Sequence, residues 1–465
     1  MDAVGLVLLK AGVSVAVLAS GFRAVSDDDY ARVTIAERFA DAPQIDPTGT
    51  SWLPLPFYVY GAALRVFGNS LTIATALAVV LGVVSALLCW SAARIARLSR
   101  CAAFAAGAIC ALLPYSAYLG AAPVPEAPTA ALCVLGAATL GRIGNLRVLG
   151  AAALFAACAS RYEAWAVAIA FTAFTLRDAV RTRERHLWLA AALAALFPVM
   201  WLLHGIVRHG DAMFFIARVT AYRAALAGTE SLLERWLRTP RGLALGEPEL
   251  AVAFFLGALP LTLMQRGFRS RALQRLLVAL AALVVLLMLG DVRGSAPTHH
   301  GERALLAVWF GMVLVSARAA EFVVTLPWKP KGFAMLWAVL LLLAVRVRQE
   351  FPREPFVNRS DAVAIGQRAR ERAFERLAID SEDYAFFAIQ AAFGHPARTT
   401  VLDDHDPRKT RPAPWTSDPQ GLSKTLRSAR IPALALPRSR APFAHAVGSV
   451  SEENNGFLLI ELRVP

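Results

Sequence analysis

The stretch Ser26-Asp27-Asp28-Asp29-Tyr30-Ala31-Arg32 follows the first long apolar segment, about Val4 to Phe22. Three successive carboxylates directly after an apolar segment cannot face lipid, because their desolvation and mutual repulsion would cost too much. They must therefore face water, a cation or a substrate. The chain that follows, through Thr50-Ser51-Trp52-Leu53-Pro54-Leu55-Pro56, is too polar to span a membrane and is rich in aromatic residues. We expect this loop to lie against the outer membrane surface and to carry the chemistry.

The composition is typical of a polytopic membrane protein. Hydrophobic residues make up 57% of the 465 residues, and they fall in long, repeated runs. Because a span needs about 20 residues to cross about 30 Å of hydrocarbon, the runs predict about eleven transmembrane helices. The predicted spans are 4–24, 70–93, 101–120, 124–141, 148–160, 163–176, 187–207, 250–265, 276–292, 303–325 and 332–348. The first lacks a basic segment and a cleavage site, so we expect a retained helix and not a signal peptide.

The net charge of +14 invites a nucleic-acid interpretation, but its distribution argues against one. Much of the excess lies in alternate short connections between apolar runs, as the positive-inside rule requires of cytoplasmic loops. This distribution predicts a cytoplasmic N-terminus, with the triple-aspartate loop, the 208–249 loop and the C-terminus outside. The basic connections contain Arg94/Arg97/Arg100, Arg142/Arg147, Arg177/Arg181/Arg183/Arg185, Arg266/Arg269/Arg271/Arg275 and Arg318/Lys329/Lys331.

Two kinds of structure are expected outside the spans. Asp29 to Ala40 and Leu55 to Phe67 have helical, amphipathic patterns and suit helices parallel to the membrane, with aromatic residues such as Trp52 at headgroup level. After residue 349 the composition shifts to a small mixed α/β domain. We therefore expect a transmembrane domain over 1–349 and a soluble extracytoplasmic domain over 350–465. Its predicted elements are helices at Asp361–Leu377 and Tyr384–Phe393 and strands at Ala433–Leu436 and Phe457–Val464.

Carboxylates at two places are candidates for catalysis. Asp27, Asp28 and Asp29, beside Tyr30, favour a site where a carboxylate takes a proton from an attacking hydroxyl. The simpler interpretation is that they set topology or cap the next helix. Glu126 is the only charged residue in Ala122-Pro123-Val124-Pro125-Glu126-Ala127-Pro128, where prolines restrict the backbone on both sides. The alternative there is a plain turn.

Cationic side chains gather in two further segments. In Thr298-His299-His300-Gly301-Glu302-Arg303, Arg303 begins a predicted helix, where free N–H groups favour an anion, so a phosphate site fits better than a metal site. A solvated loop is the alternative. The five cysteines all lie in or beside apolar runs without metal-type spacing, so no metal site is predicted. Two short spans meet at Ser160-Arg161-Tyr162-Glu163, which places Arg161 and Glu163 inside a helical bundle. There they either pair or extend to the interface.

This layout resembles the glycosyltransferase C superfamily, and specifically the bacterial relatives of protein O-mannosyltransferases and lipid A aminoarabinose transferases (glycosyltransferase family 39). Those families have an acidic pair after the first span, a Pro-rich segment similar to Trp52-Leu53-Pro54-Leu55-Pro56, and an acidic residue at the position of Glu126. Ser160-Arg161-Tyr162 is similar to their T-R-Y-like tip, and His300-Gly301-Glu302-Arg303 to a His/Glu/Arg motif. Their acidic pair is Asp-Glu and here it is a run of Asp, so Asp28 is the leading base and Asp27 its rival.

The resemblance implies an inverting hexosyltransferase in the bacterial inner membrane with its active site outside. Asp28 would deprotonate the acceptor, Glu126 would position the acceptor or a cation, and Arg161, His299, His300 and Arg303 would neutralise the departing polyprenyl phosphate. Tyr30 and Trp52 would contact substrate. The expected partners are a polyprenyl-phosphate sugar, a lipid, protein or glycan acceptor, and membrane lipids, but no nucleic acid. No cofactor is required, although a divalent cation remains an option. The alternatives are a transporter or flippase of a lipid-linked sugar, or a non-catalytic cell-envelope subunit.

Overall fold

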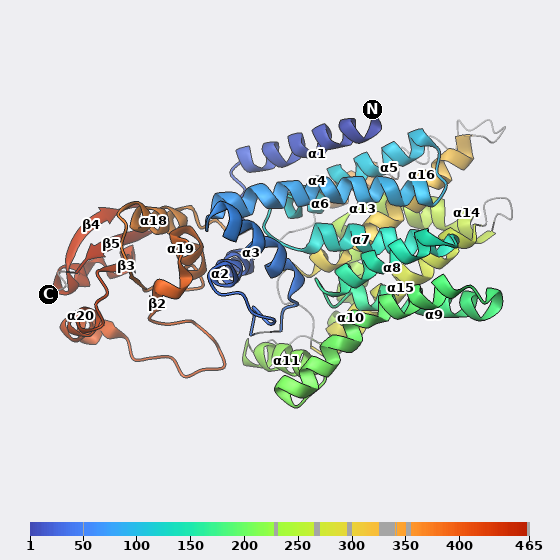
Figure 1. Cartoon of the computed structure of the whole chain (residues 1–465). Coiled ribbons are helices and arrows are strands. Elements are labelled where there is room, and N and C mark those ends of the chain that lie inside the picture. The colour runs from blue at the N-terminus through green and yellow to red at the C-terminus, as the bar shows by residue number, and fades with distance from the viewer. Residues whose placement is uncertain are drawn as a thin grey trace. The chain divides into compact units, whose positions relative to one another are not determined.

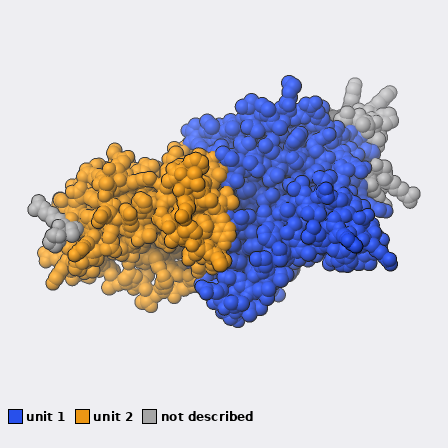
Figure 2. All heavy atoms as spheres, viewed as in Figure 1, with its two compact units in different colours: residues 1–20, 50–55, 79–355 blue, residues 21–49, 56–78, 356–465 orange. Residues whose placement is uncertain are grey.

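The computed structural model describes residues 1–49, 51–226, 231–264, 270–294, 300–324, 340, 342–349 and 355–462. These residues are mostly helical, with one small sheet near the C-terminus. The chain divides into two compact units (Figure 2). Unit 1 contains residues 1–20, 50–55 and 79–355, and unit 2 contains residues 21–49, 56–78 and 356–465. The composition predicted a domain boundary between residues 349 and 350, whereas the structure groups most of the predicted first outer loop with the C-terminal residues.

Unit 1 is a bundle of helices. In it, α8 packs against α7, α9 and α10, while α16 packs against α5, α7 and α15 (Figure 1). The helices that lie wholly in this unit are α1 (Asp2–Ala19), α5 (Arg100–Leu112), α6 (Pro114–Leu119), α7 (Glu126–Ala138), η1 (Thr139–Gly141), α8 (Asn145–Cys158), α9 (Ala164–Thr182), α10 (Arg185–His209), α11 (Phe214–Leu226), α12 (Leu232–Gly246), α13 (Pro248–Val252), η2 (Ala253–Ala258), α14 (Leu259–Met264), α15 (Arg271–Val292), η3 (Gly301–Leu305) and α16 (Leu306–Val324). Most of α4 (Leu71–Ile95) also belongs to it.

Five helices in the described residues are long and apolar enough to cross a membrane: α1, α4, α10, α15, and η3 together with α16. A sixth span results if α12 and α13–α14, which meet at a bend of 97°, are counted together. Large aliphatic side chains on α10, including Leu196, Leu203 and Val207, are exposed, which suits contact with lipid. The other apolar helices are shorter, and most of the predicted span 332–348 lies outside the described residues. The structure therefore supports membrane character, with fewer full-length helices than the eleven predicted.

The predicted span 101–120 is wrong as a single helix, because it breaks before Pro114 into α5 and α6. Leu113 is extended, with ψ of 130°, since a residue before proline is disfavoured in the helical region. Fully buried Lys10 of α1 lies at this break. Its Nζ donates to the carbonyl oxygen of Ser116 at 2.7 Å. The buried ammonium group of Lys10 thus supplies a hydrogen bond to a backbone carbonyl near the helix break.

Arg147 and Arg275 were predicted as cationic residues of cytoplasmic loops, but in the structure they form a packed cluster. Arg147 is buried, and its guanidinium donates to carbonyl oxygens of Leu140 and Arg142 and to Asp178. Arg275 of α15 binds the same aspartate. The cluster ties α8, α9 and α15 together at one end of the bundle, so these charges also stabilise the fold.

Unit 2 combines a five-stranded sheet with helices drawn from both ends of the chain. The strand order is β2-β1-β3-β5-β4, with β1 parallel to β2 and β3, and β5 antiparallel to β3 and β4. Leu434 of β3 pairs with Ile460 of β5 inside the apolar core. The elements are α2 (Asp27–Asp41), most of α3 (Leu55–Phe67), α18 (Ser360–Glu371), β1 (Leu377–Ile379), α19 (Phe386–Phe393), η4 (Pro396–Arg398), β2 (Thr399–Val401), η5 (Trp415–Ser417), α20 (Pro419–Ser428), β3 (Ala433–Pro437), η6 (Arg438–Phe443), α21 (Ala444–Val447), β4 (Ser449–Glu453) and β5 (Phe457–Glu461).

The predicted helices at 29–40 and 55–67 and the two predicted strands are confirmed as α2, α3, β3 and β5. The predicted helix Asp361–Leu377 is wrong at its end, because α18 stops at Glu371 and Leu377 begins β1. Residue Gly61 of α3 lies so close to α2 that an added Cβ would be 2.9 Å from the carbonyl oxygen of Ala36. The two helices therefore form a close pair within unit 2.

Glu37 is a fully buried acidic residue. It lies on α2, which packs against α19. Neither of its carboxylate oxygens has a hydrogen-bond partner among the described residues. Burial raises the pKa of Glu37 well above its ordinary value, and Asp41 adds to this rise, while Arg370 and Arg38 oppose it. Burial therefore favours the protonated form of Glu37 in the folded protein.

We expect the free energy of unfolding to fall as pH rises, because of Glu37. Above the pKa of an unfolded glutamate, the unfolded chain releases a proton that the folded chain keeps, so raising the pH favours unfolding until the folded pKa is reached. The slope from one group is at most about 1.4 kcal/mol per pH unit. Thermal unfolding of the full-length protein between pH 5 and 8 should show the difference from Glu37→Gln growing with pH. Glu371→Gln, at an exposed ion pair, serves as the control.

Candidate functional site

Glu126 is held at the start of α7, directly after Pro125. The helix begins at this residue, so its carboxylate lies near the positive end of the helix dipole. Only 1% of its side chain is exposed. Glu126 therefore lies inside the bundle, at the first residue of a helix.

Arg161 lies in the turn between α8 and α9 and contacts Glu126. Its Nη1 donates to Glu126 Oε1, and its Nε donates to Glu163 Oε1. Aromatic contacts fix the turn, because the Tyr162 ring stacks on Phe215 with centroids 4.1 Å apart. The Tyr162 hydroxyl also accepts from Trp201 Nε1 at 3.0 Å. The predicted pairing of Arg161 with Glu163 is present, and Glu126 extends it.

Arg303 approaches the same carboxylate from a distant part of the chain. It belongs to η3, which follows His300, a buried residue in the left-handed conformation with φ of 50°. Arg303 Nη2 lies 2.9 Å from Glu126 Oε1, and 8% of the Arg303 side chain is exposed. These contacts exclude the alternative of a solvated loop for His300 and Arg303. Residue His299 lies outside the described residues.

Together these four side chains form a row of alternating charge, Glu163–Arg161–Glu126–Arg303, which we call the charge cluster. Glu126 and Arg303 are buried in it, whereas Arg161 and Glu163 are partly exposed. Two guanidinium groups share one oxygen of Glu126. Buried charges persist only when they are paired. Arginine is the side chain best suited to bidentate binding of a carboxylate or phosphate. The cluster therefore preorganises two cations that can receive a phosphate.

The three aspartates belong to unit 2, and each has a different environment. Asp27 is bound through both carboxylate oxygens by Arg359 at 2.8 and 2.9 Å. Asp29 is buried, and its Oδ2 accepts from the Val25 backbone N–H at 2.7 Å, which ties the first turn of α2 to the segment before it. Asp28 is exposed, with no hydrogen bond or ion pair to the described part of the chain. Among the three, Asp28 is the carboxylate accessible for proton transfer.

Tyr30 and Trp52 were predicted to contact substrate. Tyr30 lies on α2, where 2% of the residue is exposed, and burial raises the pKa of its hydroxyl. That hydroxyl has no hydrogen-bond partner among the described residues. Trp52 is half-buried and belongs to the short segment 50–55 of unit 1. In this segment the Leu55 N–H donates to the carbonyl oxygen of Ala159 at 3.1 Å. Trp52 therefore lies in a segment that contacts the α8–α9 turn, whereas Tyr30 is a core residue of unit 2.

A polar group at the carboxyl ends of the parallel strands β1, β2 and β3 was not predicted from the sequence. Asp380 follows β1 and is buried, with its Oδ2 accepting from Trp415 Nε1 at 3.0 Å and from Arg440. Burial raises the pKa of Asp380 despite these contacts. His405 follows β2, and its Nε2 lies 2.8 Å from the carbonyl oxygen of Ser381. Correct placement of the short strands would have revealed this group, because the carboxyl ends of parallel strands meet at one edge.

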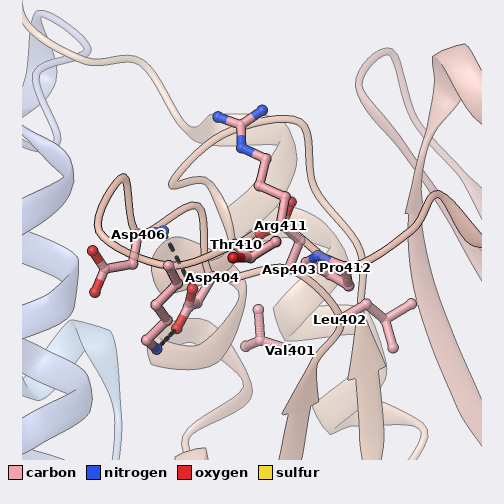
Figure 3. A pocket seen from close by; sticks show the side chains of 9 residues that line it. Val401, Leu402, Asp403, Asp404, Asp406, Thr410, Arg411 and Pro412 are labelled. Atoms are coloured by element: carbon pink, nitrogen blue, oxygen red, sulfur yellow. Dashed lines mark hydrogen bonds and ion pairs between the residues drawn. The ribbon is translucent and has the colours of Figure 1, made fainter. Parts of the chain in front are cut away.

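A cavity of about 220 Å³ lies beside that edge, in the loop that follows β2 (Figure 3). Asp403, Asp404 and Thr410 are among the residues that line it. Its charges are largely neutralised within the loop, since Lys409 binds Asp404 and Arg408 binds Asp406 at 2.7 Å. The bond from Arg408 lowers the pKa of Asp406 to about 2. Asp404 and Asp406, which line the cavity, are therefore already paired with cations of the same loop.

No protein-family model matches this sequence, and no curated protein matches it.

Proposed function

We propose that this protein is a membrane glycosyltransferase that moves a sugar from a polyprenyl-phosphate donor to an acceptor outside the cytoplasm. The observation that carries the proposal is the charge cluster, in which Arg161 and Arg303 converge on buried Glu126 among apolar helices. Intramembrane arginines are costly and usually mark substrate sites. A lipid-linked phosphate supplies the anion that two such arginines would bind.

The proposed reaction is a direct displacement with inversion. Asp28 takes the proton from the acceptor hydroxyl, whose oxygen forms the new bond to the anomeric carbon. The bond from that carbon to the phosphate oxygen breaks, and polyprenyl phosphate leaves with the electron pair. Arg161 and Arg303, with His300 and His299, neutralise the departing phosphate. Glu126 holds the two guanidinium groups in place for this step.

The proposal includes the membrane arrangement inferred from charge. The basic connections would be cytoplasmic, and the acidic stretch and the C-terminal residues would be outside, in a bacterial inner membrane. The glycosyltransferase C fold with about eleven spans belongs to the same proposal. Glu126 and Arg161 would then lie near the outer ends of their helices, where a headgroup phosphate is found.

Transfer can be tested directly with the purified full-length protein. Incubation with polyprenyl-phosphate hexoses and candidate lipid, peptide and glycan acceptors should release polyprenyl phosphate, and Arg303→Met should reduce the release. Addition of a divalent cation or a chelator tests whether the transfer depends on a metal ion. Failure to release polyprenyl phosphate from any such donor would contradict the proposal.

A flippase for a lipid-linked sugar is the second candidate, and two features favour it. The α5–α6 interruption with buried Lys10, and the 97° bend between α12 and α13, resemble the broken helices that line transport sites. Asp28→Ala separates the two functions. Loss of sugar transfer with normal expression supports the enzyme, whereas retained transfer with lost lipid movement supports the flippase.

A further inference from the structure

We propose that Arg359 is a positioning residue for the acidic stretch, through which the C-terminal residues determine which aspartate acts as the base. This inference rests on the proposed glycosyltransferase function. It assigns a role to a residue that the sequence did not single out, and it links the C-terminal part of the chain to the candidate chemistry at Asp28.

The contact between Arg359 and Asp27 is a two-pronged ion pair. Arg359 Nε lies 2.8 Å from Asp27 Oδ1, and Nη2 lies 2.9 Å from Oδ2. The same Nη2 lies 2.8 Å from Asp383 Oδ2. Parallel bonds from one guanidinium to both oxygens of a carboxylate fix orientation as well as distance. Arg359 therefore connects the start of α2 to the loop after β1.

Two neighbouring contacts show that this connection belongs to a packed strip. The Val357 N–H donates to the carbonyl oxygen of Val25 at 3.4 Å. The Phe356 ring meets Phe22 edge to face, with centroids 5.4 Å apart. The Asp27 and Arg359 side chains are each 19% exposed. A partly buried pair with adjacent packing holds its geometry better than an isolated surface pair does.

Within this strip the three aspartates have different environments. Asp27 is occupied by Arg359, and Asp29 by the Val25 N–H. Asp28, between them, is exposed. Its backbone is held on one side by the ion pair of Asp27 and on the other by the hydrogen bond of Asp29 to the Val25 N–H. Loss of Arg359 would free Asp27 and loosen the first turn of α2. The side chain of Asp28 would then no longer be held in one orientation.

The test compares Arg359→Ala with Arg359→Lys in the full-length protein. A misplaced catalytic group costs about 10²-fold in rate, so we expect Arg359→Ala to lower kcat about 10²-fold while KM changes less than about threefold. Lysine restores the charge but not the fork, so Arg359→Lys should recover about tenfold. Hydrogen exchange should be faster in Arg359→Ala at the backbone amides of Val25 and Asp29.

Control variants distinguish positioning from general stabilisation. Arg372→Ala removes an arginine that binds Glu452 and Glu461 in the same unit, and should change neither readout. In Asp27→Asn/Arg359→Ala, the second substitution should add little, because the two residues act through one contact. An Arg359→Ala protein with wild-type kcat and wild-type exchange would overturn the proposal, as would a rise in KM alone. If wild-type protein transfers no sugar but exchange still accelerates in Arg359→Ala, the glycosyltransferase function fails and the structural role of Arg359 stands.

Discussion

Asp28→Asn is expected to lower the rate of sugar transfer by about 10²- to 10⁴-fold, the usual contribution of a positioned general base. Asparagine has nearly the same size and shape but cannot accept the proton of the acceptor hydroxyl. Asp28 is exposed and contacts no described residue through a hydrogen bond or ion pair. The substitution should therefore leave folding and expression unchanged. The measurement is the initial rate of polyprenyl phosphate release at saturating donor.

A matched control for this substitution lies at the other end of the same helix. Asp41 ends α2, is exposed, and accepts from Asn69 Nδ2 at 3.0 Å. Asp41→Asn should retain the wild-type rate. Wild-type activity in Asp28→Asn, together with loss of activity in Asp27→Asn, would assign the base to Asp27. That result would also mean that the ion pair with Arg359 opens during the reaction.

Local sequence patterns predicted most helices but not their interruptions. Apolar runs located α7, α8 and α10 because hydrophobic length and composition are local properties. The break at Leu113 followed from Pro114, a local signal that the apolar run concealed. The grouping of α2 with α19 could not be predicted in this way, because it depends on contacts between segments far apart in the chain. Glu37 illustrates the same limit, since its helical position indicates a face but not which element covers that face.

The sequence indicated most residues of the candidate site but not which of them pair with one another. A lone carboxylate between prolines drew attention to Glu126, and charges at a short-helix tip drew attention to Arg161. The sharing of one Glu126 oxygen by Arg161 and Arg303 required the packing of α7 beside the α8–α9 turn and η3. Arg359 was missed because nothing near it in the sequence indicates its partner, Asp27. A charged residue in an apolar segment shows from the sequence alone that its burial is costly. Which partner offsets that cost depends on the fold.

Glu126→Gln is expected to destabilise the protein by about 3–5 kcal/mol, the usual cost of removing one partner from a buried ion pair. The amide keeps the shape of the side chain but removes the negative charge that Arg161 and Arg303 share. A clear fall in the apparent melting temperature of the full-length protein in detergent should follow. Glu371→Gln, at an exposed pair with Arg368, is the surface control and should have little effect.

The double variant Glu126→Leu/Arg303→Met separates charge pairing from packing. Replacing Arg303 as well removes one of the two guanidinium groups that lose Glu126, and Arg161 still binds Glu163. The double variant should therefore be more stable than Glu126→Leu alone. If the two single losses simply add, the pair is not coupled and the charge cluster is not a functional unit. Polyprenyl phosphate extends the comparison to binding, because a ligand that prefers the folded state raises its stability. It should raise the melting temperature of the wild type and have much less effect on Arg303→Met, since the phosphate is proposed to bind this guanidinium.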